Sequence, residues 1–300
     1  MKNFIKKILS NQYLNDFINF YKSAEMSLSS IAVAYYLIIS LFPMLLIIGN
    51  ALPYFHLNTG QILHFFQEYL PAPVFDGLED VIKSLFEQSN PALLSFSILV
   101  GVWTFARALD ALQLSMNKAY GVNLHRDFFF RRLIGIFVGI IILLFIYVMI
   151  MLTTAGGVAL TLIREHIAID QGLYSFLHNL SLPIVALTVF ISLSLLYFLL
   201  PNVKIPKARY IFPGALFSMI ILVFFTNITA QYITQTLYRF ADIKIVGSLV
   251  IVALMVWFIF IARVLIIGAI FNAIYQKKKE GTIHTRQGDI VEIIKDWRKS

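Results

Sequence analysis

The stretch AYYLIISLFP, residues Ala34–Pro43, decides which kind of fold this chain can adopt. It lies in an apolar run of about 20 residues, the length that an α-helix needs to cross a bilayer. The run lacks the alternation of a barrel strand, so a helix is the spanning structure open to it. Pro43 releases the carbonyl of Ile39, and the Ser40 hydroxyl can bond back to the preceding turn. We therefore predict a membrane helix that kinks at Pro43, where the proline serves either helix packing or a hinge.

The composition extends this interpretation to most of the chain. Hydrophobic residues make up 59% of the 300 residues, charged residues make up 13%, and the mean hydropathy is +0.80. In soluble globular proteins roughly a quarter of the residues are charged. A soluble globular fold is therefore excluded, and we predict an all-α polytopic membrane protein. The chain has no cysteine, which excludes disulfide bonds and thiolate metal sites.

Six apolar runs are long enough to cross a membrane, which predicts a bundle of six transmembrane helices. They cover residues 30–52, 91–108, 133–154, 182–200, 210–232 and 245–275. The chain then divides into an amphipathic segment 1–28, a six-span membrane domain 29–275 with an outer loop 53–90, and a basic tail 276–300. We predict that the first segment is a helix that lies in the inner membrane interface or packs on cytoplasmic loops. We expect part of the tail to be disordered.

The distribution of lysine and arginine predicts the orientation of the bundle. Nineteen of the 24 basic residues fall before the first span, in alternate loops or in the tail, four fall in the opposite loops, and Arg263 lies in the last span. Because basic residues concentrate on the cytoplasmic side, both termini are predicted to be cytoplasmic. Anionic lipid on the cytoplasmic leaflet then explains the net charge of +8 without any nucleic acid.

Several groups of residues carry a resemblance to a known family. They are AVAYYLIISLFPMLLIIGN (32–50), LVGVWTFARALDALQLSMNKAYGV (99–122), RDFFFRRLIG (126–135), FPGALFS (212–218) and VGSLVIVALMVWFIFIARVLIIGAIFNA (246–273). In this order and spacing they resemble the YihY/BrkB family of bacterial membrane proteins, over roughly residues 20–275. The resemblance implies a six-span protein of the bacterial cytoplasmic membrane. Members have been called ribonuclease BN and have been linked to serum resistance and to envelope transport related to lipopolysaccharide.

One position departs from the family pattern. Where the family usually has a glutamate, between Gly-Ala and a following Asn-Ala, this chain has Ile270. A mechanism that depends on that carboxylate is therefore not expected here. Asn272 of the same pattern is present and is a candidate substrate-binding residue, with packing between helices as the alternative.

The other candidate binding residues are arginines within or next to the apolar runs, because a charge in the membrane is costly and by default functional. Arg263 either extends its side chain to the inner headgroups or faces a cavity. The cavity would then also be lined by Arg107, Arg131 and Arg132. Such a basic pocket would suit a phosphate or carboxylate headgroup, which arginine binds through two parallel hydrogen bonds.

The sequence contains no pattern that predicts an enzyme. It has no nucleophile elbow, P-loop or pair of catalytic carboxylates, and its histidines form no metal-binding pattern, so neither a cofactor nor a metal is expected. The six spans, the candidate hinges Pro43 and Pro213 and the arginines favour a transporter or lipid-handling protein whose partners are anionic membrane lipids. A non-catalytic scaffold for envelope assembly is the alternative, and a membrane-bound ribonuclease is disfavoured.

Overall fold

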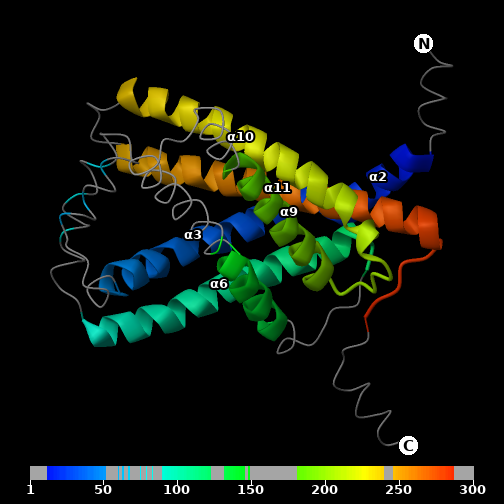
Figure 1. Ribbon diagram of the computed structural model, residues 1–300, viewed down its shortest axis with the longest axis horizontal. Helices are drawn as coiled ribbons and strands as arrows, with labels where there is room; N and C mark the ends of the chain where they lie inside the picture. The colour runs from blue at the N-terminus through cyan, green and yellow to red at the C-terminus, as the bar shows by residue number, and fades with distance from the viewer. Residues whose placement is uncertain are drawn as a thin grey trace, which may run out of the picture. The chain divides into compact units, whose positions relative to one another are not determined.

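The described part of the chain is built from helices. The computed structural model describes residues 12–51, 90–122, 132–145, 181–239 and 246–286, with a few isolated positions between them (Figure 1). The helices are α2 (Gln12–Ser23), α3 (Met26–Ala51), α6 (Pro91–Ala119), α9 (Ser181–Leu199), the short 3₁₀ helix η2 (Ala208–Tyr210), α10 (Phe212–Arg239), α11 (Val246–Glu280) and a segment at Arg132–Phe145. These ranges contain no strand beyond the single bridge between Val203 and Thr285. The predicted all-α class is confirmed for them.

Each of the six predicted apolar runs overlaps one of these helices within the described residues, but the helix ends differ from the prediction. α6 begins at Pro91 as predicted and runs on to Ala119 instead of residue 108, and α11 runs on to Glu280 instead of residue 275. The added turns contain amides such as Gln113 and Gln276. A glutamine lowers the hydropathy and so marks the end of a predicted span, although glutamine is a good helix former.

Three described helices are long and apolar enough to cross a membrane. They are Met26–Ile47, Pro91–Ala119 and Leu254–Glu280. Shorter apolar helices cover Arg132–Phe145, Pro183–Leu199 and Phe212–Phe225. Large apolar side chains such as Phe42, Phe96 and Leu99 are exposed, as expected where lipid is the solvent. The chain is therefore a membrane protein, and the number of six spans stays a prediction.

The chain forms two compact units. Unit 1 contains Met1–Glu25, Gln113–Val223 and Leu265–Ser300, and unit 2 contains Met26–Leu112 and Phe224–Val264. In unit 2, α3 continues through Pro43, and Ser40 Oγ donates to Leu37 O at 2.7 Å, which confirms the predicted bond to the preceding turn. Gly101 of α6 lies against this part of α3, since a β-carbon there would be 3.0 Å from Ile47 Cδ1 and 3.4 Å from Pro43 Cβ.

Unit 1 contains a close approach of α10 and α11. A β-carbon on Gly214 would lie 2.1 Å from Gly268 O, and one on Gly268 would lie 2.1 Å from the hydroxyl oxygen of Tyr197 on α9. Neither position has room for a side chain, so the glycines allow the helix backbones to touch. The buried Tyr197 hydroxyl donates to Leu265 O at 2.9 Å and is 2.6 Å from Ser218 Oγ, which must then be the donor of that bond. Tyr197 thereby ties α9 to both other helices.

We expect Gly214→Ala to lower the midpoint temperature of unfolding in detergent, because the added carbon would press on a backbone carbonyl that cannot rotate away. Overpacking of this kind costs about 1–3 kcal/mol. Alanine is intrinsically better than glycine in a helix by about 1 kcal/mol, so a loss of stability reports on packing. Gly101→Ala is the matched control, since its nearest neighbour is the flexible end of Ile47. A Gly214→Ala protein as stable as the wild type would contradict the close approach.

Candidate functional site

The connection between α9 and α10, residues 200–211, is the centre of a buried polar network in unit 1. Backbone groups among apolar helices must find partners inside the protein. Four almost fully buried side-chain amides supply them: Gln113 to Leu200 O, Asn117 to Asn202 N, Asn272 to Gly214 N and Gln276 to Lys204 O. The side-chain oxygens of Gln113 and Gln276 have no hydrogen-bond partner among the described residues. The α9–α10 connection of unit 1 is thus a cluster of polar groups among apolar helices.

The four amides come in two pairs on two helices. Gln113 and Asn117 are four residues apart on α6, and Asn272 and Gln276 are four apart on α11, so each pair presents one helix face. Asn117 Oδ1 accepts from Asn202 N at 2.7 Å. Three of these amides were missed in the sequence, although the four-residue spacing of amides was a readable signal. Asn272 was singled out, and the structure places it at the first turn of α10.

The chain beyond α11 completes this network. Two backbone hydrogen bonds flank the bridge between Val203 and Thr285: Lys204 N to His284 O at 2.8 Å and Arg286 N to Asn202 O at 3.3 Å. The segment 281–286 therefore pairs with the α9–α10 connection. This pairing was not predicted, because a single bridge between two residues needs no strand pattern in the sequence.

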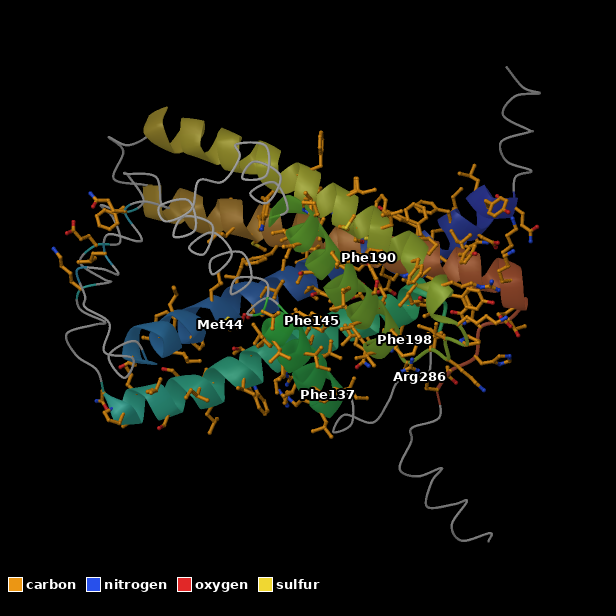
Figure 2. All side chains as sticks on the ribbon, in the orientation of Figure 1. Met44, Phe137, Phe145, Phe190, Phe198 and Arg286 are labelled. Atoms are coloured by element: carbon orange, nitrogen blue, oxygen red, sulfur yellow. The ribbon has the colours of Figure 1, made fainter. Side chains whose placement is uncertain are left out.

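Arg286 lies at the carboxyl end of α9 (Figure 2). Its Nη2 donates to Phe198 O at 2.7 Å, and the guanidinium lies 5.1 Å from the centroid of the Phe198 ring. The last carbonyls of a helix lack helical partners and carry partial negative charge, so a cation is favourable there. Burial lowers the pKa of Arg286, but a guanidinium stays charged at neutral pH. Sequence analysis missed Arg286 because it follows the last predicted span.

Several buried donors of unit 1 have no hydrogen-bond partner among the described residues, the Ser192 and Ser194 hydroxyls among them. Asn272 Oδ1 accepts from Gly214 N at 2.6 Å, which fixes the orientation of the amide and leaves Nδ2 as one such donor. The hydroxyl of the buried Tyr120, which directly follows α6, is another. Burial raises the pKa of Tyr120, so its hydroxyl keeps its proton at neutral pH.

Two of the predicted arginines belong to unit 2. Arg263 is exposed near the middle of α11, with its Nε 3.4 Å from Ser30 Oγ, and it forms no ion pair with any carboxylate that the structure describes. Arg107 is half-buried on α6, with its guanidinium 5.6 Å from the centroid of the Trp103 ring. Each guanidinium therefore has a neutral neighbour on its own unit.

The other predicted binding residues belong to unit 1 or lie outside the described residues. Arg132, at the start of the segment Arg132–Phe145, belongs to unit 1 and is half-buried. Asn272 also belongs to unit 1 and is fully buried. Arg131 lies outside the described residues. Because the candidates are divided between two units, the common arginine pocket stays a prediction.

The two candidate hinges have different surroundings. Pro43 is inside α3, whose helix continues on both sides. Pro213 is the second residue of α10, within the first turn, where a proline removes no helical hydrogen bond. The start of a helix is therefore sufficient to explain Pro213, and a hinge at Pro43 stays a prediction.

Acidic and metal-binding groups are sparse in the described part of the chain. Ile270, at the position of the family's glutamate, is fully buried. No three histidine, aspartate or glutamate side chains come together as metal ligands within the ranges that the structure describes. These ranges therefore offer hydrogen-bond donors and cations as their main polar chemistry.

Within the predicted amphipathic segment 1–28 the structure has helix α2 over Gln12–Ser23, which packs on α11. The rings of Phe17 and Phe271 lie at a tilt to each other, with their centroids 5.8 Å apart. Asp16 Oδ1 accepts from Lys277 Nζ at 2.7 Å, and the same ammonium lies 5.4 Å from the Phe20 ring centroid. Apolar and charged contacts therefore fix α2 on the carboxyl-terminal part of α11, while its place in the membrane interface stays a prediction.

Comparison with known proteins agrees with this all-helical membrane fold. The family model described as virulence factor BrkB matches residues 17–289. The chain belongs to the BrkB family. One relative is the ribonuclease-like protein YfkH of Bacillus subtilis (strain 168). It is 27% identical over 268 residues, which cover 89% of this chain and 96% of YfkH. No solved structure matches this BrkB-family chain.

We expect Asn117→Leu to destabilise unit 1, because it would leave the buried Asn202 amide without its acceptor. A buried unsatisfied group costs about 1–3 kcal/mol. Hydrogen exchange followed by mass spectrometry should show faster exchange in the peptide that contains Asn202. Asn19→Leu, an exposed position on α2, is the control and should leave that peptide unchanged. Unchanged exchange in Asn117→Leu would contradict the role of the amide.

Proposed function

We propose that this BrkB-family protein binds an anionic amphiphile, such as a lipid or another envelope-related substrate, and moves it within or across the bacterial cytoplasmic membrane. The observation that carries this proposal is Arg263, an exposed cation near the middle of the apolar helix α11. An arginine in such a place is costly unless it meets an anion, water or a polar cavity. A headgroup phosphate or carboxylate would supply the anion.

The surroundings of Arg263 support this interpretation. It lies inside Leu254–Glu280, the most apolar of the three candidate spans. The helix continues from Val264 to Tyr275 with apolar residues except Asn272, so about 18 Å of helix follows the arginine before the lysines begin. Ser30 is its described polar neighbour, and a hydroxyl does not neutralise a guanidinium.

The proposed topology has six spans with both termini in the cytoplasm. The six apolar helices and the uneven distribution of lysine and arginine support it. Lys277, Lys278 and Lys279 in the last turn of α11 would then lie at the cytoplasmic leaflet, where anionic lipids attract basic residues. Anionic membrane lipids are accordingly the proposed partners.

A non-catalytic scaffold for envelope assembly is the alternative function. It would need the buried polar residues for stability alone, and the amide network around the α9–α10 connection is consistent with such a role. We do not propose an enzyme. The name of YfkH contains the word ribonuclease-like, but the chain itself would have to use scattered acids such as Asp110 and Asp127. Purified protein whose RNA cleavage disappears on changing these acids would revive that activity.

We expect Arg263→Leu to fold normally and to lose stabilisation by phosphatidylglycerol, because the proposed headgroup contact would lose its cation. Arg263→Lys should keep part of the effect, since an ammonium cannot reproduce the planar guanidinium fork. Loss of one charged hydrogen-bonded contact corresponds to about a tenfold to hundredfold weaker lipid affinity. The measurement is the shift in unfolding temperature in detergent on adding phosphatidylglycerol, compared with phosphatidylcholine.

The control for this experiment is Arg209→Leu, which removes an exposed arginine of the short helix η2 outside the apolar spans. It should respond to phosphatidylglycerol as the wild type does. Equal stabilisation of the wild type, Arg263→Leu and Arg263→Lys would refute the proposed contact. A reconstituted assay that follows a fluorescent lipid between leaflets separates a transporter from a scaffold, because a scaffold would leave the lipid in place.

Reporter fusions test the proposed topology independently of any substrate. Fusions at Lys118, at Lys204 and in the carboxyl-terminal tail should report the cytoplasm. Fusions near Gly77, Gln171 and Asp242 should report the outside. A tail on the outside would contradict the six-span arrangement and the positions proposed for the lysines of α11.

A further inference from the structure

We propose that Ser30 is a positioning residue for Arg263, and that it turns the two outer nitrogens of the guanidinium toward the headgroup of a bound lipid. Both residues belong to unit 2, Ser30 on α3 and Arg263 on α11. This role rests on the lipid binding proposed above and adds to it the edge of the arginine that holds the anion.

The hydrogen bonds of Ser30 make its oxygen an acceptor toward Arg263. Ser30 is fully buried, and its hydroxyl donates to Ser27 O at 3.1 Å. A hydroxyl has one hydrogen, so toward any other group its oxygen can only accept. Arg263 Nε lies 3.4 Å from this oxygen, and its N–H is the donor. The bond to Ser27 O therefore keeps the hydroxyl hydrogen away from the guanidinium and presents a lone pair to it.

The contact with Ser30 uses one edge of the guanidinium and leaves another edge available. A guanidinium carries five N–H donors, one on Nε and two on each Nη. The Nη donors of Arg263 make no hydrogen bond with a residue that the structure describes, and the side chain is exposed, so a lipid can reach it. Two parallel N–H···O bonds from Nη1 and Nη2 match two oxygens of a phosphodiester.

The two helices that meet at this contact supply a single full charge. α3 has no acidic or basic residue from Met26 to Ala51, and Arg263 is the one charged residue of α11 from Val246 to Gln276. No carboxylate from these stretches competes for the guanidinium, so its attraction is open to an added anion. The phosphodiester of phosphatidylglycerol carries one negative charge and would balance the charge of Arg263.

The first turns of α3 also offer apolar surface to the acyl chains of the same lipid. Leu28, Ile31 and Tyr35 are exposed, and their spacing places them along one side of the helix. Ser30 lies within the same turns. A polar contact for the headgroup and an apolar surface for the chains therefore occur together on α3.

The test measures the affinity of the full-length protein for phosphatidylglycerol in a neutral detergent. The affinity is obtained from the rise in unfolding temperature with lipid concentration, and phosphatidylcholine is the reference lipid. We expect Ser30→Ala to weaken the affinity about twofold to tenfold, the effect of one hydrogen bond. In the Arg263→Lys background the same change should have no further effect, because an ammonium rotates freely and has no fixed edge to orient. A serine that serves packing alone would weaken binding equally in both backgrounds.

Ser40→Ala is the matched control for the loss of a serine hydroxyl. Ser40 is also buried on α3 and also donates to the carbonyl three residues earlier, Leu37 O, at 2.7 Å. It makes no hydrogen bond to an arginine that the structure describes. This variant should bind phosphatidylglycerol as the wild type does.

The outcomes separate the positioning role from the lipid binding on which it rests. Weaker binding in Ser30→Ala that disappears in the Arg263→Lys background supports the positioning role. Wild-type affinity in Ser30→Ala, together with lost binding in Arg263→Leu, would overturn the positioning role and leave the lipid contact in place. Equal weakening in both backgrounds, or in Ser40→Ala, would also overturn it. Wild-type affinity in Arg263→Leu would overturn the lipid contact as well.

Discussion

The fold of unit 1 depends on one constraint, which is that backbone groups between α9 and α10 must be hydrogen-bonded without help from water. Amides on α6 and α11 meet this need at Leu200, Asn202, Lys204 and Gly214. Because those partners lie on two different helices, the same bonds also fix the register of α6 and α11 against the connection. Polar residues inside an apolar bundle thus serve first as hydrogen-bond partners of the backbone. A functional role has to rest on polar atoms that such hydrogen bonds do not use.

This distinction separates the two tyrosines of unit 1. Tyr197 lies where glycines let the helix backbones touch, and its hydroxyl is fully used by Leu265 O and Ser218. Tyr120 is as well buried, yet its hydroxyl has no described hydrogen bond. Arg263 in unit 2 is a comparable case, because Ser30 gives it a contact without neutralising its charge. Arg263 is therefore a cation that packing does not explain, and a guanidinium is a group that recognises anions.

Much of the fold could be predicted from the sequence, whereas most of the candidate site could not. Apolar length located all six helical regions, and the start of α6 at Pro91 and the Ser40 bond beside Pro43 were predicted correctly. Asn272 was found because an amide stands out in an apolar run. Tyr120 and Arg286 were missed because each lies just beyond a helix, and their partners are distant in sequence. The hydrophobic periodicity of a sequence does not encode such contacts, because they depend on how the helices pack against one another.

The pairing of the α9–α10 connection with the last part of the chain has a consequence for biosynthesis. Gln276, His284 and Arg286 bind Lys204, Asn202 and Phe198, which are made about 80 residues earlier, and synthesis proceeds at roughly 5–20 residues per second. Until then, the connection keeps unsatisfied backbone groups. The nascent protein therefore needs several further seconds of synthesis before the backbone groups of this region are all hydrogen-bonded.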